Sequence, residues 1–294
     1  MQVDLEATLE LSPADRAEVE ALSRACLAAD GIDPGLHPAT QLNVVRDMPA
    51  WFLAWGKGRS GGRTLVGSAC LFAPSRSEGE LSAAVSPLWR RQGIFMGLYA
   101  LAMDALRGAS IPALLLAADA RRGFGKSLAD RLGGVRSHGE HLMALERCDA
   151  GLGRQGEAVR LVPVTGAELP LAAGLSSEIF GDEPADALAF VQGLLDDPSR
   201  EQFLAMGTGG PVGMVAMSTI DGRHMIHGLG VVPAARGAGF GKAILDAALA
   251  VLFGRGAERV SLEVDDGNAA AIALYASRGF KDESRTDYWR IPVA

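Results

Sequence analysis

The spacing of apolar and polar positions divides the chain into helices with a period near 3.6 and strands with a period of two. Amphipathic helices are predicted over residues 94–107 and 240–254, because apolar residues recur there three and four positions apart. The apolar runs "ALLLAAD" (113–119) and "RVSLEVD" (259–265) predict buried strands. The full pattern predicts the order ααβββαβαβ, and it occurs twice.

The two occurrences form an internal repeat with a constant offset. Val66-Gly67 and Val212-Gly213 are separated by 213 − 67 = 146 residues, and the same offset joins further pairs. These pairs are Pro87 and Pro233, Arg90 and Arg236, Gly93 and Gly239, Asp119 and Asp265, and Gly133 and Gly279. Each copy also opens with a capping box, Ser12 to Asp15 and Thr165 to Glu168, which predicts a helix start.

The repeat predicts two domains, residues 1–150 and 158–294. The stretch between them, "CDAGLGRQGE" (148–157), is glycine-rich and polar and has no apolar periodicity, as expected of a domain boundary. The chain has 294 residues, of which 48% are hydrophobic, so each domain has enough apolar material to form its own core.

The charge of the chain narrows the choice of partners. The net charge is −7, and residues 151–294 carry 12 basic against 18 acidic side chains. This balance opposes binding to a nucleic-acid backbone and is compatible with a cationic small substrate such as an amine. We therefore expect a small-molecule amine or a peptide N-terminus as partner and no nucleic acid. For the chain itself, we expect a monomer or a homodimer.

The sequence also bears on compartment and on metals. The first residues carry acids where a secretory signal has basic ones, and no apolar run reaches the roughly 18 residues of a membrane span. These features predict a cytoplasmic protein with no membrane contact. Cys26, Cys70 and Cys148 lie far apart without metal-ligand spacing, so neither a disulfide framework nor a metal site is expected.

A glycine-rich loop carries the clearest chemical signal. A predicted strand ends at Val231-Val232-Pro233, and the loop Arg236-Gly237-Ala238-Gly239-Phe240-Gly241-Lys242 leads into the helix over 240–254. Glycines allow close approach of a ligand to the backbone, and the N–H groups at a helix N-terminus attract negative charge. The loop matches neither the P-loop nor the G-x-G-x-x-G fingerprint. It predicts a site for a nucleotide-like diphosphate.

A second motif follows the loop: Asn268-Ala269-Ala270-Ala271-Ile272-Ala273-Leu274-Tyr275, then Gly279-Phe280. Together with the Val-x-Pro strand end and Arg-x-x-Gly-x-Gly-Lys, this order resembles the GNAT superfamily of N-acetyltransferases. The resemblance implies an α/β (α+β) fold of two tandem GNAT-type domains, each a mixed, mostly antiparallel central sheet flanked by helices. It implies acetyl-CoA as acyl donor. The tandem arrangement is similar to two-copy members of this family whose second copy is catalytic.

The resemblance also implies roles for individual residues. The loop N–H groups would hold the CoA pyrophosphate, while the strand end would pair with the pantetheine arm and polarise the thioester carbonyl. Asn268 has two compatible roles, as a helix N-cap and as a contact to the cofactor arm. The implied cofactor-binding residues are Leu229, Val231, Val232, Arg236, Gly237, Ala238, Gly239, Phe240, Gly241, Lys242, Asn268, Ala271 and Tyr275.

Tyr275 and His227 are the candidate catalytic residues. Tyr275 would protonate the departing CoA thiolate, which requires help from its surroundings because a phenol has a pKa of about 10. Many relatives use a glutamate on the strand before the loop to accept the proton of the amine, but here Met225 has that position. His227 is the nearest titratable group on the same predicted strand face. Glu263 and a chain of water molecules remain alternatives.

The first copy departs from the motif. Phe95 replaces the last glycine of the loop, Ala129 stands where Tyr275 is expected, and Arg122 stands where Asn268 is expected. We therefore predict a degenerate domain that is still able to bind CoA but whose main role is to support the second domain. A non-catalytic acyl-CoA-binding regulator is the alternative to an enzyme, and the retention of Tyr275 in the second copy favours the enzyme.

Overall fold

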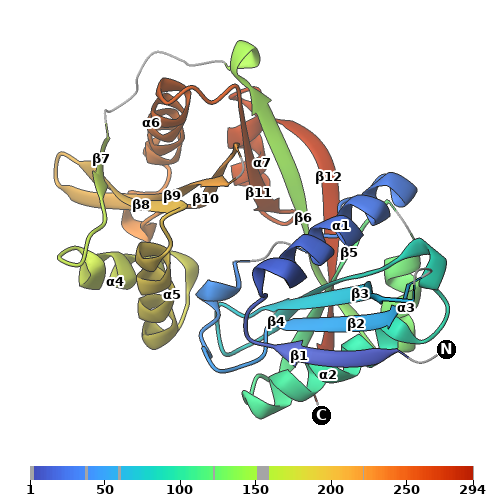
Figure 1. The fold of residues 1–294 in the computed structure, drawn as a ribbon. Helices are drawn as coiled ribbons and strands as arrows, with labels where there is room; N and C mark the ends of the chain where they lie inside the picture. The colour runs from blue at the N-terminus through green and yellow to red at the C-terminus, as the bar shows by residue number, and fades with distance from the viewer. Residues whose placement is uncertain are drawn as a thin grey trace. The chain divides into compact units, whose positions relative to one another are not determined.

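A computed structural model describes residues 3–36, 39–58, 61–121, 123–150, 159–220 and 222–293. The chain divides into two compact units, and each is a sheet flanked by helices (Figure 1). Unit 1 comprises residues 1–137 and 287–294, and unit 2 comprises residues 138–286. Among the described residues, no helix has the length and apolarity needed to span a bilayer.

Unit 1 contains the elements of the first copy up to the start of its last strand. These are β1 (Asp4–Thr8), α1 (Pro13–Asp30), η1 (Thr40–Leu42), β2 (Trp51–Lys57), β3 (Arg63–Phe72), β4 (Gly79–Val85), η2 (Pro87–Trp89), α2 (Ile94–Gly108), β5 (Ala113–Asp119) and α3 (Phe124–Arg131). The strand order is β1-β2-β3-β4-β5-β12. Apolar side chains of α2 and α3 pack on one face of this sheet, and those of α1 pack on the other.

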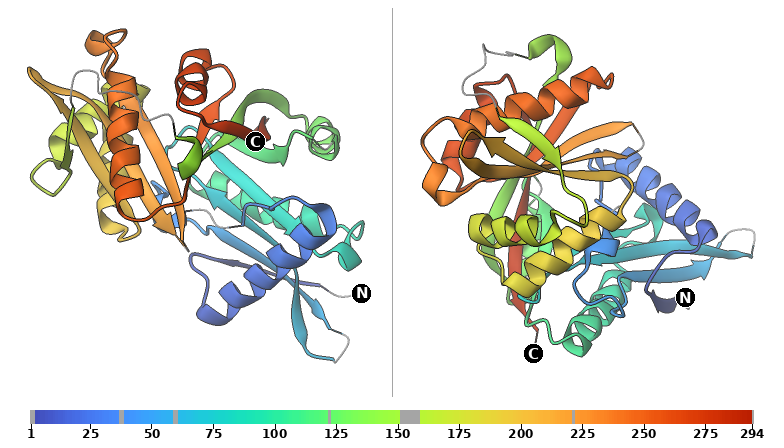
Figure 2. Two further views of the ribbon diagram at one scale, coloured as in Figure 1. Left: turned by 90° about the horizontal axis from the view of Figure 1, so that it is seen from above. Right: turned by 90° about the vertical axis from the view of Figure 1, so that its left-hand side faces the viewer.

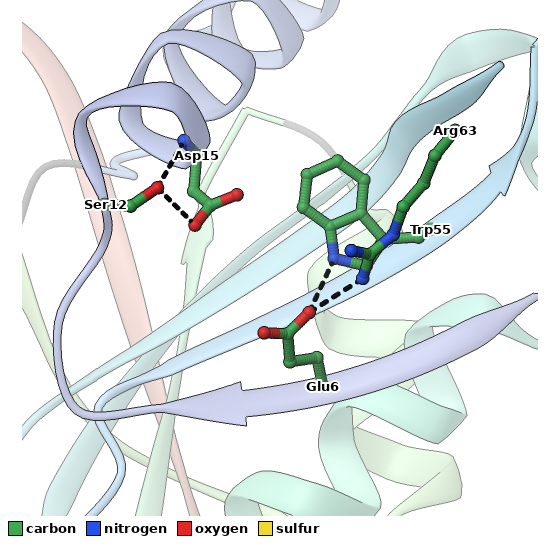
Figure 3. Close-up of polar contacts among 5 residues, drawn as sticks. All are labelled: Glu6, Ser12, Asp15, Trp55 and Arg63. Carbon is green, nitrogen blue, oxygen red and sulfur yellow. Dashed lines mark hydrogen bonds and ion pairs between the residues drawn. The ribbon is translucent and has the colours of Figure 1, made fainter.

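The opening of unit 1 is fixed by local polar contacts (Figure 3). The Ser12 hydroxyl accepts the N–H of Asp15 at 3.1 Å, so the first predicted capping box does begin a helix. On β1, the carboxylate of Glu6 accepts hydrogen bonds from Trp55 Nε1 at 3.2 Å and from Arg63 Nη2 at 2.7 Å. These contacts tie the edge strand to β2 and β3.

Unit 2 contains most of the second copy. Its elements are β6 (Val135–Glu146), η3 (Arg147–Asp149), β7 (Arg160–Pro163), α4 (Leu169–Phe180), α5 (Pro184–Asp196), β8 (Arg200–Gly207), β9 (Gly210–Ile220), β10 (Arg223–Val231), η4 (Pro233–Ala235), α6 (Phe240–Gly254), β11 (Arg259–Asp265), α7 (Ala269–Ala276) and β12 (Lys281–Pro292). The strand order is β6-β11-β10-β9-β8-β7. Its neighbours are antiparallel except β10 and β11, which run parallel.

Helices cover both faces of the sheet in unit 2 (Figure 2). On one face, α6 and α7 form a core with Phe203, Val215, Ile226 and Leu262 of the strands. On the other face, α4 and α5 pack with Leu204 and Met214. The fold class is therefore the predicted one, a mixed and mostly antiparallel sheet flanked by helices.

The compact units are not the two sequence copies, because the last strands of the copies are exchanged. Most of β6 belongs to the first copy in sequence but lies in unit 2, while residues 287–294 at the end of β12 lie in unit 1. There, Trp289 and Ile291 enter the core with α2. The predicted boundary between the copies stays a prediction, because residues 151–157 of it lie outside the described residues.

Three details differ from the sequence prediction. In the described residues of the first copy, one α-helix, α1, precedes β2 where two were expected, since Gly31, Pro34 and Gly35 interrupt the following segment. The short edge strands β1 and β7 were not expected. The second capping box forms a turn in which Ala167 N–H donates to Thr165 Oγ1 at 3.3 Å, and α4 begins only after it.

Candidate active site

The loop between β10 and α6 has the backbone conformation of an anion site. Gly237 and Gly239 have φ angles of 79° and 86°, a left-handed conformation that glycine adopts without strain. Gly239 is the N-cap of α6 and provides no side chain to cap it. Within the described part of the chain, the N–H groups from Gly237 to Lys242 have no hydrogen-bond acceptor. Six free donors at the positive end of a helix favour a phosphate.

Arg236 anchors this loop to the end of the preceding strand. Its Nε donates to the carbonyl of Val231 at 3.1 Å, and its Nη2 donates to the carbonyl of Ile179 at 3.3 Å. Among the described residues, no carboxylate pairs with Arg236. Its positive charge therefore adds to that of the helix N-terminus.

Strands β10 and β11 separate next to the loop. Among the described residues, their parallel pairing covers only His224 to Ile226 with Val260 to Leu262. A β-bulge follows on β10 between His227 and Gly230, where Gly228 has φ 52°. Beyond this point both strands continue without pairing to each other, and we call this unpaired stretch between β10 and β11 the opening.

The end of β10 turns backbone donors toward this opening. Val232 donates its N–H to Val212 of β9 at 3.0 Å. Successive N–H groups of a strand point to opposite edges, so the N–H of Val231 points to the side of β11. A backbone donor at that edge is free to bind an extended ligand arm or a carbonyl oxygen.

Tyr275 lies on the face of the sheet covered by α6 and α7. It is 6% exposed, and its ring centroid lies 5.9 Å from that of Phe280. Leu229, Val231 and Ala271 belong to the same apolar cluster. Burial raises the pKa of the Tyr275 phenol, so it stays protonated at neutral pH and is able to donate a proton.

Asn268 caps the helix that carries this tyrosine. Its Oδ1 accepts the N–H of Ala271 at 3.1 Å, as expected of an N-cap. The first turn of α6 lies close to the same helix, because a β-carbon at Gly241 would be 3.5 Å from Leu274 Cδ2 and 3.7 Å from Val231 Cγ2. The glycine loop, the strand end and α7 thus meet at one place, while Val232 packs into the core with α4.

His227 lies on the opposite face of the sheet, together with Met225. Its Nε2 is 2.8 Å from the hydroxyl of Ser218, a contact that only the pairing of β9 with β10 creates. Burial, and secondarily the charge of Arg200, lowers the pKa of His227 to about 4. At neutral pH this histidine is uncharged. His224 points to the other face and contacts Thr219.

Glu263 lies on the same face of the sheet as His227. The pairing of the two strands ends at Ile226 and Leu262, and His227 and Glu263 are the next residues on β10 and β11, so both side chains share one face. The side chain of Glu263 is exposed. Desolvation of its carboxyl by the surrounding protein nevertheless raises its pKa to about 7, and the charge of Glu140 contributes in the same direction. A carboxylate with this pKa is suited to accept a proton at neutral pH.

The arrangement fits a thioester donor with a pyrophosphate. The loop and Arg236 offer a phosphate site, the edge of β10 offers donors to an extended arm, and the opening has proton-transfer groups on both faces. Among the described residues, no group of three or more His, Cys, Asp or Glu side chains is placed to bind a metal ion. This geometry is compatible with acyl transfer.

Known proteins share these features. Residues 171–280 match the acetyltransferase (GNAT) family. The chain is 32% identical to the mycothiol acetyltransferase of Thermobispora bispora, over 92% of this chain and 93% of that protein. The mycothiol acetyltransferase of Kineococcus radiotolerans is 34% identical, and the match covers 52% of this chain and about half, 54%, of that relative.

The tandem architecture has a counterpart among solved structures. A tandem GNAT protein from the clavulanic acid biosynthesis pathway has a TM-score of 0.71 at 17% identity, over 100% of this chain and 99% of that one. This likeness concerns the fold. With the relative that matches nearly the whole length, it supports the mycothiol synthase-like tandem architecture, as the repeat and the family resemblance together suggested. The chain belongs to the GNAT family of acetyltransferases.

Proposed function

We propose that this enzyme moves an acetyl group from acetyl-CoA to a primary amine of a small molecule or peptide, by direct attack in a ternary complex. Acetyl-CoA supplies an activated acetyl thioester. The observation that carries the proposal is the opening between β10 and β11, with Tyr275 on one face and Glu263 and His227 on the other. An acid and a base on opposite faces suit a transfer in which the two substrates enter from different sides.

The residues of the loop and the strand end would hold the donor. The N–H groups from Gly237 to Lys242 and the guanidinium of Arg236 would bind the pyrophosphate. The N–H of Val231 would bind the arm and stabilise negative charge on the acyl oxygen. Tyr275 would donate its proton to the leaving sulfur. No covalent intermediate on the enzyme is required.

For the proton of the amine, we propose Glu263 as acceptor ahead of His227. Both are within the group of alternatives that the sequence offers. A carboxylate whose pKa is about 7 is the stronger base at neutral pH than an imidazole whose pKa is about 4. His227 also has its Nε2 engaged by Ser218. His227 would then line the acceptor side as an uncharged hydrogen-bonding group.

The charge on the acceptor side supports a cationic substrate. Glu263 and Glu140 lie on this face of the sheet, and Asp182 follows α4. Burial and the neighbouring charge of Asp186 raise the pKa of Asp182, as expected where carboxylates gather. The names of the relatives make the acceptor of mycothiol acetyltransferases the first amine to test.

The test is CoA thiol release from acetyl-CoA in the presence of an amine panel that includes small amines, amino-thiols and peptide N-termini. We expect release with at least one amine and a loss of kcat of about 10²-fold or more in Tyr275→Phe. Tyr99→Phe in unit 1 is the matched control and should keep wild-type kcat. Tight acetyl-CoA binding without release for any amine would instead indicate the non-catalytic regulator.

A further inference from the structure

The exchanged strand β6 brings residues of the first copy next to the proposed base. β6 pairs with β11 in antiparallel register from Arg259 opposite Glu146 to Asp265 opposite Glu140. Leu142 is therefore directly opposite Glu263. Since side chains alternate along a strand, Leu142 and Glu140 share the face of Glu263.

Glu140 is thus the diagonal neighbour of Glu263. Diagonal neighbours in an antiparallel pair are about 7–8 Å apart at their backbones, which is within reach of long side chains. Two carboxylates at this separation repel each other, and the repulsion favours a protonated form. The charge of Glu140 acts on Glu263 in this direction and raises the pKa of its carboxyl.

Other charged groups also lie on this face of the sheet. Arg259 of β11 is engaged by Glu146 at 2.7 Å and by Glu283. His227 of β10 is uncharged at neutral pH. The charged and titratable groups on this face include His227 of β10, Arg259 and Asp265 of β11, His138, Glu140 and Glu146 of β6, Arg200 of β8 and Glu283 of β12.

We propose that Glu140, carried into unit 2 by the exchanged strand, is a positioning residue that acts through Glu263 and sets the pH range in which the enzyme takes the proton of the amine. The proposal rests on the proposed role of Glu263. It gives the first copy a direct part in the chemistry of the second, and it predicts that a fragment from residue 151 onward lacks full activity.

The test compares pH profiles of kcat/KM. Activity rises with pH as Glu263 loses its proton, with a midpoint near 7. Glu140→Gln keeps the size of the side chain and removes its charge, so the midpoint should move down by about half a unit to one unit. Activity at pH 6 should then rise several-fold relative to the plateau. Glu140→Asp keeps the charge and should restore most of the wild-type midpoint.

The control is His141→Gln on the same strand. His141 lies on the other face of β6, where its Nδ1 contacts Asp282 at 3.0 Å, so this change disturbs the strand without removing charge near Glu263. The midpoint should stay at the wild-type value. If β6 only stabilises the fold, Glu140→Gln and His141→Gln should both keep the wild-type pH midpoint and differ from the wild type only in thermal stability.

Two outcomes separate the failure of this inference from the failure of the proposed function. A Glu140→Gln profile that superimposes on the wild type overturns the inference, provided that Glu263→Gln removes the limb near pH 7. If Glu263→Gln keeps that limb, the base itself is misassigned. Titration of the Glu263 carboxyl carbon by NMR, in the enzyme without substrates, gives a readout independent of turnover and should show the same downward shift in Glu140→Gln.

Discussion

The two copies keep one backbone conformation at the glycine loop and differ in the side chains around it. Gly93 and Gly239 are both helix N-caps, with φ angles of 78° and 86°. At the position where unit 2 has Gly237 at φ 79°, unit 1 has Arg91 at φ 62°. A left-handed arginine is costly, yet the loop has not relaxed. The turn into the helix therefore has the same backbone conformation in both copies, although the side chains around it differ.

The arginine of the loop shows where the copies diverge. Arg90 donates its Nε to Val85 as Arg236 does to Val231, at 3.1 Å in both. However, the rest of the Arg90 guanidinium forms a bidentate pair with Asp30 of α1, at 2.9 and 2.5 Å. The charge that unit 2 offers to an anion is neutralised in unit 1, so the same loop is a weaker anion site there.

The sheet faces differ more than the loops. The row of residues one step beyond the last parallel pair is polar in unit 2 and mostly apolar in unit 1. In unit 2 it consists of Gln202, Ala216, His227 and Glu263, and in unit 1 of Trp51, Cys70, Ser82 and Ala117. Trp51 and Cys70 belong to the core with α1. Unit 1 thus uses for packing the face that we propose as the acceptor side in unit 2.

Removal of the proposed base should have the largest effect. Glu263→Gln should lower kcat by about 10²- to 10⁴-fold, because an amide cannot accept the proton. The carboxylate acts only when deprotonated, so wild-type activity should rise through pH 7 and the variant should lose this rise. Thiol release measured from pH 5 to 9 checks both points. Ala117→Glu in unit 1 should not rescue the variant, and a rescue would show that both units are catalytic.

A buried ion pair in unit 2 offers the next largest effect. Arg278 and Asp246, with side chains 5% and 17% exposed, pair at 2.5 Å and link the end of α7 to α6. At the offset of 146, unit 1 has Leu132 and Ala100 instead. Asp246→Asn should lower the free energy of unfolding by about 3 kcal/mol, because it removes the charge of one partner from a buried ion pair.

Urea unfolding followed by circular dichroism measures this loss. The double variant Asp246→Ala and Arg278→Leu copies the pair in unit 1 and removes both charges, so it should recover a large part of the stability. If the double variant is as unstable as the single one, the loss comes from packing and the charge argument is wrong. The Asp246→Asn variant should also lose kcat, since α7 carries Tyr275.

Local patterns made most of the fold predictable from the sequence. The helices over 240–254 and 94–108 agree with the prediction to within one residue, because their apolar spacing is regular and their own faces form the cores. The strand exchange was not predictable. β6 and β12 have the same place in each copy, and which sheet each one joins depends on contacts far along the chain.

The candidate site, like the fold, was predictable from the sequence only in part. The glycine loop and Tyr275 carry a motif, so their positions could be inferred from the resemblance, although their roles stay predictions. Ser218, the partner of His227, lies nine residues earlier on the adjacent strand of a hairpin. The spacing of the sequence does not reveal this contact, because it depends on the register of β9 with β10. The influence of Glu140 on Glu263 depends on strands more than 100 residues apart. Such pairings arise from tertiary structure and are not visible in spacing.

A smaller effect, on the KM for acetyl-CoA, should distinguish the glycine loop of unit 2 from that of unit 1. Gly239→Ala introduces no clash, since a β-carbon there has no atom within 4 Å, but it forces alanine into a left-handed conformation. We expect KM for acetyl-CoA to rise about 10-fold with kcat nearly unchanged, because a shift of about 1–2 kcal/mol in the loop weakens donor binding. Gly93→Ala should cost similar stability and leave KM unchanged. An equal rise in KM would place a working donor site in unit 1.

The smallest expected effect concerns the strained arginine of unit 1. Arg91→Gly should raise the free energy of unfolding by up to about 1 kcal/mol, because glycine adopts φ 62° without the steric cost of a β-carbon. Arg91→Ala removes the guanidinium but keeps the β-carbon, so it should give no gain. Thermal unfolding of the three proteins side by side measures the difference. A gain in Arg91→Ala equal to that in Arg91→Gly would mean that the charge, and not the backbone, destabilises the loop, and the conformation shared by the two copies would then carry no cost.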